Sequence, residues 1–137
     1  MKKNAVLCVL ISFVGIVTGV YIFNNSRGTV EIIEKESYYS NFHVENDKVY
    51  IECVVTIKNS NNYKKTINLS ARFDEDVNIG LLKQAKIYAF SSSNIKEKFE
   101  IKQNSKDTFD VVFVGDFGGT MKKHDRTLPD IDIDIVD

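Results

Sequence analysis

The stretch VYIECVVTIK, residues 49–58, decides the fold of this chain. Its apolar residues occupy every second position, from Val49 to Ile57, as in a strand with one face in a core. Cys53 belongs to that row and is predicted to be buried. The same period of two, interrupted by polar turns about every ten residues, continues over residues 29–137. This spacing indicates an antiparallel sandwich or barrel, and we predict an all-β domain that is a sandwich of short strands.

The expected strands follow from the alternation and from the turn residues between them. They span Val30–Lys35, Tyr39–Val44, Lys48–Lys58, Thr66–Phe73, Lys86–Phe90, Lys98–Ile101, Thr108–Val114 and Ile131–Val136. Inward-facing residues on three of them are Ile67, Leu69, Ala71 and Phe73, then Phe109, Val111 and Phe113, then Ile131, Ile133 and Ile135. The stretch Ile79–Ala85 is compatible with a helical turn or a strand.

Composition limits the class of protein. The chain has 137 residues, of which 43% are hydrophobic and 27% charged, with a formal net charge of -1. These values exclude collagen-like, disordered and disulfide-framework proteins. The balanced charge offers no electrostatic surface for nucleic acid, so we predict no nucleic-acid partner.

The N-terminus carries a long apolar segment. Residues 5–23, AVLCVLISFVGIVTGVYIF, contain no charge and follow Lys2 and Lys3. A helix of this length spans about 28 Å, close to the thickness of the hydrocarbon core of a bilayer. We predict a transmembrane anchor over residues 1–23, a short linker over 24–28 and an extracellular domain over 29–137. The lysines place the N-terminus in the cytoplasm by the positive-inside rule.

Cleavage of this segment as a signal peptide is the alternative. Val17, Thr18 and Gly19 offer small residues near a possible cleavage site, and the domain would then be secreted. Cys8 lies inside the apolar run and not at its end, which argues against lipoprotein processing. We read Cys8 as a membrane-buried apolar residue, with acylation as a minor alternative.

Several segments together resemble a known group of domains. These are the apolar N-terminus, the strand VYIECVVTIKNS, the strand INLSARF and the late unit FEIKQNSKDTFDVVFVG. The combination resembles the immunoglobulin-like domains of small surface-anchored proteins and lipoproteins of Gram-positive bacteria. The resemblance covers roughly residues 49–114 and implies an immunoglobulin-like β-sandwich at the cell surface. The chain differs from the lipoprotein members because no cysteine follows the apolar segment.

The best candidate for a binding site is the long connection Gly115–Asp130, GDFGGTMKKHDRTLPD. Long loops on rigid sheets often carry function. Paired glycines allow unusual backbone angles, and charged residues follow them. The candidate binding residues are Asp116, Gly118, Gly119, His124, Asp125 and Arg126. The alternatives are an ordinary solvated connection, or phosphate or headgroup binding by its basic cluster.

Catalytic and metal-binding patterns are not found in the sequence. His43 and His124 show no metal-ligand spacing with Cys53, and no phosphate loop or nucleophile motif occurs. The aspartates of the last third could bind calcium, but Asp116–Thr120 does not match a calcium loop. Asp132 and Asp134 alternate with isoleucines, as the solvent face of an edge strand would. We predict no catalytic residue, no metal and no cofactor.

These observations favour a non-enzymatic binding or interaction protein, held in the membrane through residues 5–23 and displaying its domain to a protein partner at the cell surface. An envelope-located immunity or inhibitor protein against a toxin or hydrolase is the alternative. A hydrolase assembled from separate loops would require convergent Asp, His and Ser side chains in a pocket.

Overall fold

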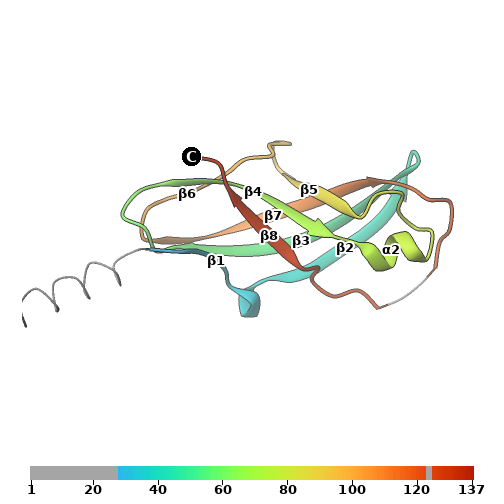
Figure 1. Cartoon of the computed structure of the whole chain (residues 1–137), viewed down its shortest axis with the longest axis horizontal. Helices are drawn as coiled ribbons and strands as arrows, with labels where there is room; N and C mark the ends of the chain where they lie inside the picture. Colours follow the sequence, from blue (N-terminus) through green and yellow to red (C-terminus); the bar gives the residue numbers. More distant parts are fainter. Residues whose placement is uncertain (1–27, 123–124) are drawn as a thin grey trace, which may run out of the picture.

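The computed structural model describes residues 28–122 and 125–137, and these form an all-β structure built on one antiparallel sheet of eight strands (Figure 1). The strands are β1 (Val30–Ile32), β2 (Tyr38–Glu45), β3 (Lys48–Asn59), β4 (Lys65–Arg72), β5 (Lys86–Ser91), β6 (Phe99–Ile101), β7 (Ser105–Asp116) and β8 (Ile131–Ile135). A 3₁₀ turn, η1 (Glu34–Glu36), follows β1, and a short helix, α2 (Asp74–Asn78), follows β4.

The ladder between β3 and β7 is the centre of the sheet. It pairs residues without interruption from Lys48 with Asp116 to Asn59 with Ser105. On its other edge β3 is shared by two strands, since β2 pairs with its first half and β1 with its last three residues. The β2–β3 hairpin closes through Asn46 and Asp47, both with positive φ, which suits the twist of a two-residue hairpin.

Strand β5 joins the two halves of the sheet. Its last residues, Ala89–Ser91, pair with β7, whereas its first residues pair with the end of β4. Strand β4 also pairs with β6 on the β5 side and with β8 on its opposite edge. The sheet therefore curls back on itself, and Figure 1 shows β4 and β8 lying across β3 and β7.

The core fills the space between the two halves. Edge-to-face ring contacts tie them together, with Phe73 5.4 Å from Phe113 and Phe99 5.3 Å from Phe109 between ring centroids. Most of the core comes from alternate residues of β3, β4 and β7, as the period of two requires. Its fully buried members include Val49, Ile51, Cys53, Val55, Ile57, Ile67, Leu69, Ala71, Val111 and Phe113.

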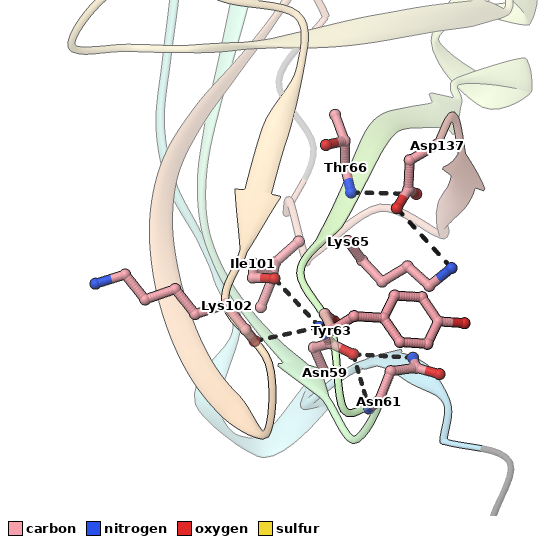
Figure 2. Close-up of polar contacts among 8 residues, drawn as sticks. All are labelled: Asn59, Asn61, Tyr63, Lys65, Thr66, Ile101, Lys102 and Asp137. Carbon is pink, nitrogen blue, oxygen red and sulfur yellow. Dashed lines mark hydrogen bonds and ion pairs between the residues drawn. The ribbon is translucent and has the colours of Figure 1, made fainter.

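A buried asparagine ties the β3–β4 turn to the end of β6 (Figure 2). The side-chain amide of Asn59 donates to the carbonyl oxygens of Tyr63, Ile101 and Lys102 at 2.9 to 3.2 Å. Its side-chain oxygen accepts from both the backbone and the side chain of Asn61 at 2.9 Å. Asn59 is fully buried, and these contacts satisfy it.

The all-β prediction and the position of every expected strand are confirmed, with corrections at several ends. The first strand stops at Ile32 and not at Lys35, because η1 turns the chain and Ser37 Oγ donates to the Ile33 carbonyl. Ile135 was predicted to face the core, but its side chain is 52% exposed and lies outside the core. The last strand lies at an edge, where little covers its end.

Two further differences concern the connections. Helix α2 was not expected, and Ile79–Ala85 forms neither the helix nor the strand considered for it, apart from an isolated bridge between Leu82 and Phe117. Strand β7 continues to Asp116, so the long connection begins at Phe117.

The predicted anchor over residues 1–23 lies outside the described residues, as does most of the linker. Within residues 28–122 and 125–137, no helix has the length and apolar character needed to cross a membrane.

Candidate functional site

A pocket of about 250 Å³ lies where α2 meets the segment that leads into β8. Its wall is formed by the end of β4, by α2 and by the segment before β8, through Asp125, Arg126, Thr127 and Pro129. Tyr39 of β2 and Ile51 of β3 complete the lining. Figure 1 shows the chain before β8 passing α2 on its way to the sheet. Four carboxylates and two guanidinium groups line the pocket, so its lining carries more negative than positive charge. The charged residues are Arg72, Asp74, Glu75, Asp76, Asp125 and Arg126.

Arg126 anchors this wall. Its Nη2 donates to Asp76 Oδ1 at 2.7 Å and its Nη1 to Asp76 Oδ2 at 3.3 Å. The two side chains are 11% and 7% exposed, so this is a two-point ion pair shielded from water. The guanidinium carbon also lies 4.4 Å from the centre of the Phe42 ring, a cation–π contact with β2. Arg126 thus fixes the segment to α2 and to β2.

The first part of the long connection is also fixed, by backbone contacts. The N–H of Gly118 donates to the carbonyl of Leu81 at 2.7 Å, and the N–H of Thr120 to that of Gly80 at 3.1 Å. A Cβ at position 118 would lie 2.3 Å from the Gly80 carbonyl oxygen, so only glycine allows this approach. The connection is therefore packed on the turn after α2.

The rim of the pocket carries a second ion pair. Arg72 donates to Asp74 through Nε at 3.0 Å and through Nη2 at 2.7 Å, in the planar two-point geometry typical of arginine. These hydrogen bonds hold the pKa of the Asp74 carboxyl below its ordinary value. Both side chains are more than half exposed. The rim is thus charged and open to water, whereas the Asp76–Arg126 pair beneath it is not.

The structure separates the residues predicted for the binding loop. Asp125 and Arg126 line the pocket together. Asp116 lies at the end of β7 and pairs with Lys48 across the ladder, which lowers the pKa of Asp116. Gly118 packs on Gly80, and Gly119 has a φ of +99° with open space around it. His124 lies outside the described residues.

Sequence reasoning missed the other wall of the pocket. Helix α2 supplies Asp74, Glu75 and Asp76, and the end of β4 supplies Arg72. The signal was present as the run RFDEDVN, which places three acids in one short turn after an arginine. The same run is also typical of a solvated loop. Only its contact with Arg126 in the structure shows that it forms part of the pocket wall.

The other chemically notable residues lie away from the pocket. Cys53 is buried in the core, and burial raises the pKa of its thiol to about 12, so the thiol keeps its proton at neutral pH. His43 stacks on Tyr50 of the neighbouring strand, with 4.5 Å between the ring centroids. Neither residue lines the pocket.

No cluster of three or more His, Cys, Asp or Glu side chains suited to a metal ion occurs in the parts of the chain that the structure describes. Comparison with protein families, with characterised proteins and with solved structures found no match.

Proposed function

We propose that this protein is a non-enzymatic binding module, anchored in the cell membrane through residues 5–23, with an immunoglobulin-like domain outside the cell. The uncharged run of residues 5–23 after two lysines supports the anchor and its orientation. The antiparallel sheet, curled around one core, supports the domain type. Secretion after cleavage within the apolar segment is the alternative location.

The observation that carries the proposal is the pocket held by Arg126. A binding surface gains affinity when it is ordered before the partner arrives. Here the buried pair with Asp76 and the contact with Phe42 hold residues 125–129 in place. The exposed rim, with Asp74 and Glu75 on α2, then presents charge on a fixed frame. Such a surface suits a protein partner that offers basic or hydrogen-bond-donating side chains.

A photocrosslinking experiment on intact cells tests this proposal. The full-length chain would carry a photoreactive phenylalanine analogue at Asp125 or, as the matched control, at Asn94, which is exposed and does not line the pocket. We expect a crosslinked protein from position 125 and none from position 94. Equal crosslinking from both positions, or none from either, would overturn the pocket as the binding surface.

Protease treatment of the same cells tests the location. We expect the domain to be digested from outside while a membrane fragment containing residues 5–23 survives. Mass spectrometry of the mature N-terminus separates an anchored chain from a cleaved one. A domain that is digested only after the cells are lysed would overturn the extracellular placement.

A further inference from the structure

The curled sheet does not close into a barrel. Among the described residues β8 pairs with β4 alone and β1 with β3 alone, so each has one unpaired edge. Two hollows lie between these edges. One, of about 460 Å³, is bordered by Ile32 and Ile131, and the other, of about 610 Å³, by Val30 and Ile135. We call this open side, between β1 and β8, the seam.

The backbone of β8 offers a regular set of hydrogen-bonding groups to the seam. The Val136 N–H donates to the Thr66 carbonyl at 3.0 Å, and these two residues continue the β4–β8 register. In an antiparallel ladder alternate residues bond to the same neighbour, so Asp132 and Asp134 also bond to β4. The remaining backbone groups point into the seam, and they belong to Ile131, Ile133 and Ile135.

The same reasoning applies to β1. The Ile33 N–H donates to the Thr56 carbonyl at 2.9 Å, in register with the pairing of β1 and β3. Val30 and Ile32 therefore turn their N–H and carbonyl groups away from β3. The unpaired edges of β1 and β8 therefore both direct backbone N–H and carbonyl groups into the seam. Apolar side chains from both strands also line its hollows.

The end of β8 is fixed beside the seam (Figure 2). Asp137 accepts a hydrogen bond from the Thr66 N–H at 3.3 Å, and its other oxygen lies 4.0 Å from Lys65 Nζ. Lys65 in turn lies over the ring of Tyr63, 4.5 Å from its centre. The edge of β8 is therefore held in position along its length, by β4 within the strand and by Asp137 after it.

The borders of the seam are acidic. Asp132 and Asp134 are exposed on the outward face of β8, with Asp130 just before it. Glu31 of β1 and Glu34 of η1 are exposed on the opposite border. Basic side chains also lie beside them. Lys65 lies by Asp137, and Arg72 is bound by Asp74 and interacts with Asp132, whereas Lys35 and Lys58, which is opposite Glu31, are exposed.

We propose that the free edge of β8 binds an extended segment of a protein partner in which apolar and basic residues alternate. The added strand would pair with the backbone of Ile131, Ile133 and Ile135. Every second side chain would face the hollows, whose apolar borders at Ile131 and Ile135 are about 13 Å apart in an extended strand. The intervening side chains would lie beside Asp132 and Asp134, where lysine or arginine is favoured.

A second copy of this chain is a poor occupant of the same edge. If two β8 strands paired antiparallel around Ile133, Asp132 of one copy would face Asp134 of the other. Like charges directly opposite each other destabilise a strand pair. The charges that discourage self-association therefore select a basic strand. The smaller hollow shares Thr127 and Pro129 with the pocket, but no residue of β8 lines the pocket, so the inference does not require the pocket to bind a partner.

The test uses the full-length chain in detergent and a synthetic peptide of alternating valine and lysine, long enough to span β8. We expect the peptide to bind and salt to weaken binding. The variant D132K/D134K should lose about tenfold in affinity, since two favourable cross-strand pairs become unfavourable. It should also gain affinity for a peptide of alternating valine and glutamate.

A matched control carries the same change in net charge elsewhere. The variant E97K/D110K alters two exposed acids outside the seam and should bind the lysine peptide nearly as the natural chain does. An equal loss of affinity in both double variants would mean that overall charge, and not the edge of β8, determines binding, and it would overturn the proposal. Failure of the natural chain to bind the lysine peptide at low salt would also overturn it.

Amide hydrogen exchange reads out the site of binding. We expect the peptide to slow exchange at Ile133 and Ile135, whereas Asp132 and Asp134, already bonded to β4, should change little. I133P is a second variant, because proline at this position removes a donor to the seam and none to β4. It should abolish binding. Protection of the Ile133 and Ile135 amides without peptide would show that the edge is already occupied, and would overturn the proposal.

Discussion

Asp76 and Arg126 face each other across two segments that are far apart in sequence, with 2.7 Å between Arg126 Nη2 and Asp76 Oδ1. One lies in α2 and the other in the segment that leads to β8. The pair is shielded from water and braced by the Phe42 ring. It connects the only helix longer than one turn in the described part of the chain to the segment that leads into the last strand.

Substitution R126A should lower the free energy of unfolding by about 3 kcal/mol, because it leaves the Asp76 carboxylate buried without its guanidinium partner. Urea denaturation at neutral pH measures this. Thr127 of the same segment is exposed, and T127A should change the stability by less than about 0.5 kcal/mol. The double variant D76L/R126L removes both charges and should cost less than R126A alone. A loss in R126A as small as that in T127A would contradict a structural role for Arg126.

Substitution N59A should lower the free energy of unfolding by about 3 kcal/mol. It leaves the carbonyls of Ile101 and Lys102 without the donor that satisfies them (Figure 2). The measurement is again urea denaturation. The control is N62A, because Asn62 is exposed and its bond from the Asn104 side chain is long, at 3.4 Å. Similar losses of unfolding free energy in N59A and N62A would show that the buried amide of Asn59 contributes little to the stability of the fold.

Substitutions G118A and G119A should differ in their effects, although the residues are neighbours. A methyl group at 118 would meet the Gly80 carbonyl, and we expect a loss of about 2 to 3 kcal/mol. At 119 there is space, and only the positive φ opposes a side chain, so about 1 kcal/mol is expected. Thermal unfolding of both variants checks the order. The reverse order would mean that the connection moves away from Gly80 at little cost.

Cys53 should make the protein lose stability in alkaline solution. Burial raises the pKa of its thiol from 9.0 to about 12, so above pH 9 the unfolded chain releases a proton that the folded chain keeps. The free energy of unfolding then falls by about 1.4 kcal/mol for each pH unit within that window. C53A lacks this contribution. The difference in stability between the natural chain and C53A, measured by urea denaturation under reducing conditions, should therefore shrink as pH rises above 9.

A difference between the two proteins that stays constant from pH 8 to pH 11 would contradict this account. Other groups that titrate in alkali, such as exposed lysines, are the same in both proteins and cancel in the comparison.

The strands could be predicted because alternation is a local property. In β3 the row from Val49 to Ile57 specifies both the strand and its buried face, whatever the strand pairs with. The ends of the strands were predicted less accurately. Strand β1 stops where the chain turns through η1, and that turn depends on the hydrogen bond from Ser37 to Ile33. Neither the charged residues nor the turn-forming residues in the sequence indicated this hydrogen bond.

The pocket could not be predicted in the same way. From the sequence, Arg126 is expected to be an exposed loop residue. Its burial depends on Asp76, which lies in a helix too short to show a helical period of apolar residues. Asn59 reads as the start of a polar turn, yet it is the buried end of β3 because carbonyls after β6 converge on it. Long-range polar contacts of this kind leave no periodic trace in the chain.

The pairing of β3 with β7 also sets an order of assembly. A chain made from its N-terminus completes β3 well before β7, and everything from Ser60 to Asn104 must be made in between. During that interval β2 and β1 cover one edge of β3, and the other edge displays a long, apolar, unpaired strand. The unfinished chain, and not the finished domain, is therefore the stage at which this protein is most prone to aggregate.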